Sequence, residues 1–425
     1  MRSRNNKIWQ SLLIGLLYIL SGCNMQTGDR TQVLPEDAIV IGLCVPLSGQ
    51  NSIAGLVTRK AVTLAIEEIN AKGGVLNRPL ALLPLDSEGN RALAVSNASQ
   101  MIDTGVVAII GAVSSSVTTE IASQVTIDKN MVLISPRSTS PVISSMEDNQ
   151  TLWRTVASDI YQAKIAAEEA YAQGYRKVST LCVDNAYGNL LTEAFVENFL
   201  RLGGSVYQRV SYPELESSEL NFFSFKGYVA QLFDSEESPD MVYCAMYTEA
   251  SKISSEMAPY LEAHQVGVMV SESSYRDNFL NNADEVFLSL VRGTVPYSLK
   301  EDETYQQYEA AYRERYLGEE PPALTATGYD AVYLLALAME AAGSTDTNQL
   351  KQYLGEVSGP TGVAVTASQW EQAIDLLRSN QKINYEGASG KIDFDENGDV
   401  TSGNYAIWSV KEGSFVIEKV KKFPE

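Results

Sequence analysis

The stretch "VAIIGAVSSSVTTE", residues 107–120, joins an apolar run to a polar, helix-like segment through a single glycine. The four apolar residues 107–110 are typical of a buried strand, and the pattern from about residue 116 is typical of a helix. The first turn of such a helix has backbone N–H groups without partners. The stretch therefore predicts one strand–turn–helix unit of a parallel sheet, with three serines at the junction.

Similar units recur on both sides of this stretch. Because the strand-like runs are separated by helix-like segments, the pattern predicts parallel sheets with helices on both faces. A break near residues 153–158 divides the runs into two groups, which favours two sheets over one. The predicted strands are 39–43, 80–85, 107–110, 131–134, 178–183, 241–245, 267–270 and 291–295. The predicted helices are 57–70, 92–102, 117–127, 160–172, 190–202, 250–263, 303–317 and 326–342.

The N-terminus has the features of an export signal. Three basic residues precede an apolar segment, 8–20, which is shorter than the roughly 20 residues needed to span a bilayer. The following "LSGC" ends at Cys23 and resembles the bacterial lipobox. This resemblance implies cleavage before Cys23 and attachment of a lipid to its sulfur. We expect 1–22 to be a signal peptide and 23–37 to be a tether.

Composition limits the classes of function. The chain has 425 residues, of which 45% are hydrophobic, and a formal net charge of −21. The length suits two ordinary domains, each with its own core. Such an acidic chain is a poor candidate for binding nucleic acid or anionic lipid surfaces, so we predict no nucleic-acid partner.

Motifs for catalysis and metal binding are not legible. His264 is the only histidine, which argues against zinc sites and histidine-based triads. Residues 393–398 resemble the start of a calcium loop, but Asn404 stands where a bidentate glutamate is needed. We therefore predict no enzyme activity, no cofactor and no metal. The three later cysteines lie in strand-like runs typical of buried residues, and whether Cys182 and Cys244 pair stays open.

Six stretches in a fixed order give the chain a family resemblance. It resembles the type I periplasmic-type solute-binding proteins of ABC importers, in the branched-chain (Leu/Ile/Val) amino acid-binding group. The resemblance implies two α/β lobes joined by a three-segment hinge, which close on a ligand like a Venus flytrap. The implied lobes are 38–155 plus 292–385, and 156–291 plus 386–425. The stretches are "IVIGLCVPLSG", "AVTLAIEEINAKGGVLNRPLALLPLDSEGN", "GVVAIIGAVSSSVT", "VLISPRSTSP", "TGYDAVYLLALAMEAAG" and "GASGKIDFDENGDV".

The same resemblance implies a function. The chain would be a monomeric, extracytoplasmic receptor, anchored by lipid to a bacterial membrane. It would capture a small ligand, most readily an amino acid, between its lobes and deliver it to ABC permease and ATPase subunits. Two alternatives stay open: a receptor for urea or short amides, and a sensor that feeds a signalling protein.

The serines of the opening stretch are predicted to hold an anion. Open α/β sheets bind ligands at the carboxyl ends of their strands, where a helix N-terminus stabilises negative charge. Ser114 matches the family position that holds a ligand α-carboxylate, and Ser115 lies beside it. Thr139 matches a second polar contact to the backbone atoms of an amino acid. The alternative for these serines is simple helix capping.

The second lobe is expected to supply the remaining contacts. Glu272 follows the predicted strand 267–270 and matches the acid that binds the ligand ammonium, with Glu249 as the rival. Tyr187 and Tyr247 match aromatic positions that close over the ligand. Arg137, in a loop of the first lobe, would favour a polar or acidic ligand side chain if it faces the cleft. The alternative is that Arg137 points to solvent.

Overall fold

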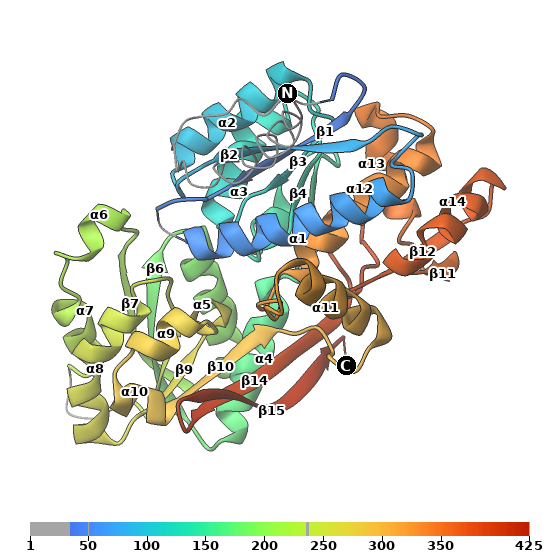
Figure 1. The fold of residues 1–425 in the computed structure, drawn as a ribbon. Helices are drawn as coiled ribbons and strands as arrows, with labels where there is room; N and C mark the ends of the chain where they lie inside the picture. Colours follow the sequence, from blue (N-terminus) through green and yellow to red (C-terminus); the bar gives the residue numbers. More distant parts are fainter. Residues whose placement is uncertain (1–34, 50, 235–237, 425) are drawn as a thin grey trace, which may run out of the picture. The chain divides into compact units, whose positions relative to one another are not determined.

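The computed structural model describes residues 35–49, 51–234 and 238–424, and Figure 1 shows their chain path. The predicted signal peptide, Cys23 and nearly all of the predicted tether lie outside the described residues.

The first sheet has five strands in the order β2-β1-β3-β4-β5, and all of its strand pairs are parallel. Successive side chains of a strand point to opposite faces. In β3, Ile110 lies in one buried core and Ile109 lies in another. Both faces are covered, which explains why this strand reads as a continuous apolar run. The strands are β1 (Ile39–Val45), β2 (Leu80–Asp86), β3 (Ala108–Gly111), β4 (Leu133–Ser135) and β5 (Leu152–Arg154).

Helices cover both faces of the first sheet. On one face α1 and α12 lie side by side, and α12 is buried over nearly its whole length (Figure 1). On the other face α2 packs against α3, which continues as a π-helical turn over Ala122–Thr126. The helices of this part of the molecule, including α11, α13 and α14, which pack against other helices and the small sheet described next, are α1 (Ser52–Ala71), α2 (Arg91–Thr104), α3 (Ser115–Ile121), α11 (Glu303–Arg315), α12 (Ala326–Ala342), α13 (Thr347–Glu356) and α14 (Trp370–Arg378).

A small sheet of three strands, in the order β11-β12-β13, shares the core of α1 and α12. Its strands are β11 (Val363–Val365), β12 (Ile383–Gly387) and β13 (Gly390–Lys391). We refer to this sheet, the first sheet and their helices as the first lobe.

The second sheet has seven strands in the order β15-β14-β10-β9-β8-β6-β7. The four pairs from β10 to β7 are parallel, and β14 and β15 add an antiparallel edge. We call this sheet and its helices the second lobe. Its strands are β6 (Lys177–Asp184), β7 (Ser205–Pro213), β8 (Met241–Ala245), β9 (Gly267–Val270), β10 (Val291–Pro296), β14 (Gly403–Lys411) and β15 (Ser414–Phe423). Its helices are α4 (Asp159–Ala172), α5 (Ala186–Arg201), α6 (Ser217–Leu220), α7 (Lys226–Gln231), α8 (Ala250–His264), α9 (Asp277–Asn282) and α10 (Glu285–Leu290).

The chain passes between the two lobes three times, through residues 155–158, 297–302 and 392–402. Arg154, the last residue of β5 directly before the first crossover, is bound to Asp399 in the third. Its Nε donates to Asp399 Oδ1 at 2.5 Å and its Nη2 donates to Asp399 Oδ2 at 2.8 Å. Because both side chains are buried, this bidentate ion pair fixes the two crossovers to each other.

The predicted α/β class, with two mostly parallel sheets covered by helices, is confirmed. Strand pairing differs from the expected lobe limits at two points. Residues 292–296 belong to the second sheet, because β10 pairs with β9 and β14. Residues 386–391 lie with the first lobe, because β12 and β13 pair there. An apolar run predicts a strand but not the sheet in which it pairs, so these limits were not readable from the sequence.

Cys44, Cys182 and Cys244 are buried free thiols, so Cys182 and Cys244 do not pair. Burial, followed by the charge of Asp86, raises the pKa of Cys44 to about 12. Burial likewise raises the pKa of Cys182 to about 11 and raises the pKa of Cys244 further. Cys44 belongs to a core of the first lobe, and the other two belong to the core of the second.

Among the residues that the structure describes, no helix is both long enough and apolar enough to cross a membrane.

Candidate functional site

Gly111 ends β3 at the carboxyl edge of the first sheet, in a conformation that favours glycine. Its φ angle is 154°, and a Cβ atom there would lie 2.4 Å from the carbonyl oxygen of Cys44. The chain then presents Ser114 as the N-cap residue of α3. Ser114 is half-buried, and its side chain makes no capping hydrogen bond. The capping alternative is therefore wrong for Ser114, and its hydroxyl is left to bind another group.

The loop after β4 forms the second part of this edge. The Ser115 hydroxyl accepts a hydrogen bond from the N–H of Ser140 at 3.1 Å, which ties the loop to α3. Thr139 in the same loop is 1% exposed, and its carbonyl oxygen accepts from the N–H of Asp159 at 2.8 Å. The structure thus brings Ser114, Ser115 and Thr139 together, although Ser115 is partly engaged by the protein itself.

Asp159 was not among the residues predicted from the sequence. It is the first residue of α4, directly after the crossover 155–158, and it is buried. Neither carboxylate oxygen has a hydrogen-bond partner among the described residues. Burial and then the charge of Glu272 raise the pKa of Asp159 well above its usual value, whereas Thr139 and Arg154 act in the opposite direction. A buried carboxyl group without a partner costs free energy, so this position suits a ligand that brings a hydrogen-bond donor or a cation.

Two tyrosines form an aromatic wall on the second lobe. The rings of Tyr187 and Tyr247 are stacked, with centroids 5.1 Å apart and an interplanar angle of 16°. Asn185 caps α5 by accepting from the N–H of Tyr187, which fixes the start of the helix. The Tyr187 hydroxyl donates to Ser271 Oγ at 2.7 Å. Burial, and then the charge of Glu272, raises the pKa of Tyr187 well above its usual value, so the phenol keeps its proton.

Glu272 follows β9 at the carboxyl edge of the second sheet, as predicted. It is half-buried, and Gln162 Nε2 donates to its Oε2 at 2.8 Å. Burial raises the pKa of Glu272, while the hydrogen bond from Gln162, the nearby Tyr187 hydroxyl and the charge of Arg137 oppose this rise. Asp159 and Glu272 therefore form a pair of interacting carboxyl groups at the same edge.

The rival acid, Glu249, is engaged inside the second lobe. Its Oε1 accepts from the Tyr212 hydroxyl at 2.5 Å and from the N–H of Tyr247 at 2.8 Å. It is also only 3% exposed. Because two protein donors already bind this oxygen, Glu272 is the better placed acceptor for a ligand.

Arg137 is half-buried, and its Nη1 donates to the carbonyl oxygens of Leu324 at 3.1 Å and Ala323 at 3.4 Å. Burial lowers the pKa of Arg137 to about 10, Glu272 opposes this shift and Arg276 adds to it. The guanidinium group thus interacts electrostatically with two groups of the second lobe, Glu272 and Arg276. The alternative, in which Arg137 points to solvent, is wrong. Part of its donor capacity is nevertheless used by the loop before α12.

Glu214 links the two lobes next to the aromatic wall. It follows β7, and its Oε1 accepts from Asn185 Nδ2 at 2.8 Å and from Ser116 Oγ at 3.5 Å. Its other oxygen forms an ion pair with Arg91 of α2. In addition, the Ser140 hydroxyl donates to the carbonyl oxygen of Ala186 at 2.6 Å. These contacts hold the carboxyl edges of the two sheets together around the residues described above.

The arrangement suits a small zwitterion. The first lobe offers a free serine hydroxyl beside a helix N-terminus, where an anion is stabilised. The second lobe offers the carboxyl groups of Glu272 and Asp159, which can bind an ammonium group. Stacked tyrosines close one side and give apolar surface.

The family model described as "Receptor family ligand binding region" matches residues 57–413. The chain belongs to this family. The chemotactic signal transduction system substrate-binding protein BasB of Halobacterium salinarum is 25% identical over 382 residues, which cover 84% of this chain and 83% of that protein. Leu/Ile/Val-binding protein homolog 1 of Brucella abortus is 25% identical over 384 residues, covering 88% of this chain and 91% of the relative.

The fold of this receptor-family member also matches solved structures. A leucine-binding protein, LivK, from Thermotoga maritima superposes with a TM-score of 0.75 at 24% sequence identity, covering 90% of this chain and 98% of that structure. This structure confirms the expected fold, and the family match together with the Leu/Ile/Val-binding relative confirms the resemblance to type I periplasmic binding proteins of the branched-chain group.

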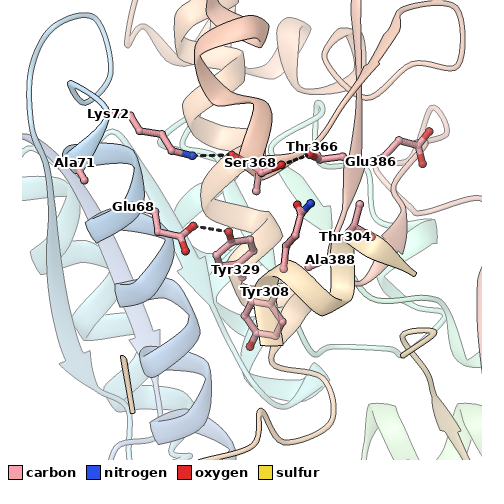
Figure 2. A pocket seen from close by; sticks show the side chains of 12 residues that line it. Glu68, Ala71, Lys72, Thr304, Tyr308, Tyr329, Thr366, Ser368, Glu386 and Ala388 are labelled. Atoms are coloured by element: carbon pink, nitrogen blue, oxygen red, sulfur yellow. Dashed lines mark hydrogen bonds between the residues drawn. The ribbon is translucent and has the colours of Figure 1, made fainter. Parts of the chain in front are cut away.

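A separate pocket of about 270 Å³ lies within the first lobe of the protein (Figure 2). Glu68 accepts the hydroxyl hydrogen of Tyr329 there, and Lys72 Nζ donates to the carbonyl oxygen of Ala367 at 3.1 Å. These polar groups are already paired with the protein, whereas Asp159 is not. The pocket contains none of the predicted site residues, so we assign the functional site to the facing edges of the two sheets.

Proposed function

We propose that this chain is an extracytoplasmic receptor that binds an amino acid between its two lobes. One observation carries the proposal: a free hydroxyl, that of Ser114, and two carboxyl groups, the buried one of Asp159 and the half-buried one of Glu272, stand at the facing edges of the sheets. The α-carboxylate would bind at Ser114, Ser115 and Thr139. The ammonium group would bind Glu272 with help from Asp159, and Tyr187 and Tyr247 would enclose the ligand.

The ligand would then be passed to an ABC permease with its ATPase subunits. The name of the Brucella relative, a Leu/Ile/Val-binding protein homolog, supports an amino acid as the ligand. Binding shifts the population toward the closed form, because some contacts exist only there. The importer recognises the closed, monomeric receptor and the ligand leaves chemically unchanged, so the protein acts without catalysis.

A second candidate function is ligand sensing for a signalling system. The Halobacterium relative, a substrate-binding protein of a chemotactic system, favours this alternative. Both functions require the same ligand binding. They differ only in the partner protein that recognises the closed form. Co-purification of the ligand-loaded protein with a permease or with a transducer distinguishes them.

Anchoring through Cys23 belongs to the same proposal and rests on the "LSGC" sequence. Cys23→Ser should abolish lipid labelling and shift the protein out of the detergent phase in a phase-separation assay. Unchanged partition of the variant into detergent would contradict the anchor.

The ligand class is tested by a thermal-shift panel of the twenty amino acids, urea and small amides. A ligand at roughly one hundred times its Kd stabilises the folded state by about 2.7 kcal/mol, which is readily measured. An amino acid should raise the melting temperature and should be recovered unchanged after long incubation. A response to urea or amides alone, or chemical conversion of the ligand, would refute the proposal.

A further inference from the structure

Arg276 carries a guanidinium group of which two nitrogens have no partner among the described residues. It lies four residues after Glu272, in the segment that links β9 to α9. Its Nε and Nη2 atoms are buried and make no hydrogen bond to any described residue. Guanidinium groups are rarely left in this state, because each unpaired buried donor costs free energy. The two nitrogens therefore point to a group that is supplied from outside the chain.

Arg276 lies in a turn at the edge of the ligand site, where its backbone N–H donates to the carbonyl oxygen of Ser274 at 2.9 Å and Ser273 Oγ accepts from the Tyr187 hydroxyl at 3.3 Å. Burial lowers the pKa of Arg276, and the nearby carboxyl groups of Glu249 and Glu272 oppose this shift. Tyr187 belongs to the aromatic wall, and Glu272 is the proposed ammonium acceptor. Glu249 is already engaged with Tyr212 and with the backbone of Tyr247, and within the described part of the chain it forms no ion pair with Arg276.

The positions of Nε and Nη2 of Arg276 indicate which kind of ligand group would bind them. Nε and Nη2 form one edge of the guanidinium plane and offer two parallel N–H donors. A carboxylate offers two parallel acceptors and matches this edge with two charge-assisted hydrogen bonds. A side-chain amide has only one oxygen, so its NH₂ group would face a donor of the arginine. An aliphatic side chain would leave both donors unpaired.

We propose that Arg276 binds a carboxylate on the ligand's side chain, so that the receptor takes an acidic amino acid, L-glutamate or L-aspartate. The inference rests on the proposed function, because it takes the α-carboxylate to bind at Ser114 and the ammonium group at Glu272. The side chain then extends along Tyr187 toward Arg276. Arg137 adds a second positive group to the same site, and its charge opposes the rise in the pKa of Glu272.

The test is calorimetric titration of L-glutamate, L-aspartate, L-glutamine and L-leucine into the wild-type protein and three variants. Arg276→Met removes the donors but keeps much of the side-chain length. Arg276→Lys keeps the charge but loses the two-donor edge, and it serves as a second variant if the methionine protein folds poorly. Arg209→Met is the matched control, since Arg209 is an exposed arginine of β7 in the same lobe.

We expect wild-type protein to bind one acidic amino acid at least tenfold more tightly than L-leucine. Arg276→Met should weaken that acidic ligand by about 30-fold or more and change L-leucine by less than threefold, as expected for loss of a buried charge pair. Arg276→Lys should give an intermediate loss, and Arg209→Met should match wild type. Tighter binding of L-leucine than of both acids, or equal weakening of all ligands by Arg276→Met, overturns this inference and leaves the proposed function standing. Binding of none of the four, and of no other amino acid, overturns both.

Discussion

Replacing Glu272 by glutamine should weaken ligand binding and, at the same time, stabilise the ligand-free protein. The two effects have one cause, which is the burial of a carboxyl group to which, among the described side chains, Gln162 donates a hydrogen bond. With ligand bound, the ammonium group compensates this burial. Without ligand, the negative charge of Glu272 is poorly compensated. The raised pKa of Glu272 reflects this unfavourable burial.

The loss of affinity can be bounded. Removing one partner of a buried, hydrogen-bonded charge pair costs about 2–5 kcal/mol. Glu272 is half-buried, and the amide oxygen of a glutamine still accepts, so the lower end of this range applies. We therefore expect Glu272→Gln to bind the ligand roughly 30-fold more weakly than wild type.

The effect on stability follows from the direction of the pKa shift. A carboxyl group with a raised pKa in the folded state binds its proton more tightly there than in the unfolded chain. Its contribution to stability is therefore greatest at low pH, and it falls as the pH rises from the ordinary value of 4.5 through the raised folded value. At pH 7, Glu272→Gln removes this penalty, so the ligand-free variant should melt above the wild type.

Differential scanning calorimetry with titration of the ligand measures both effects, and Glu249→Gln is the control. Glu249 accepts from Tyr212 and from the backbone of Tyr247, so its replacement should lower ligand-free stability by about 1–3 kcal/mol. Ligand affinity should stay within about threefold of wild type. The reasoning is refuted if Glu272→Gln binds normally while Glu249→Gln does not, or if Glu272→Gln melts below wild type without ligand.

Three further substitutions test the framework of the site. Gly111→Ala should lower the free energy of unfolding in urea by about 1–3 kcal/mol, because its φ angle and the nearby backbone both exclude a Cβ atom; equal midpoints would contradict this. Arg154→Met leaves Asp399 buried without its partner and should cost about 3–5 kcal/mol in the same assay, and a loss below about 1 kcal/mol would show that the crossovers are held otherwise. Arg91→Ala removes an ion pair between the lobes whose two side chains are 47% and 27% exposed, so stopped-flow release of the ligand should speed up measurably, by a factor of at most about five, and unchanged release would show that this ion pair does not help to hold the lobes together.

The sequence was most informative where a strand is buried on both faces. The predicted strands Met241–Ala245 and Gly267–Val270 have the bounds seen in the structure, because all their residues are buried and apolar or small. Ser205–Pro213 was missed, since this edge strand has mostly exposed or half-buried side chains and carries several polar residues. Leu152–Arg154 was missed because it has three residues and ends in a buried arginine.

For the candidate site too, some residues could be predicted from the sequence and others could not. Glu272 and Tyr187 were identified because each follows a predicted strand, and strand ends meet at one edge of a parallel sheet. Asp159 follows a crossover instead, and Arg276 lies several residues beyond a strand end, so neither has a local signal. What distinguishes them is that buried atoms of an ionisable side chain have no partner among the described residues, and this property exists only once distant segments are packed together.

The rates at which the three buried thiols react can be used to measure local opening of the folded chain. A thiol reagent reacts with the thiolate, so burial and a raised pKa keep Cys44, Cys182 and Cys244 unreactive until the surrounding core opens. Since Cys44 samples the first lobe and the other two sample the second, labelling rates in a Cys23→Ser background would report each lobe separately. A ligand that draws its affinity from both lobes should slow labelling at all three positions, whereas one held by a single lobe should protect that lobe alone.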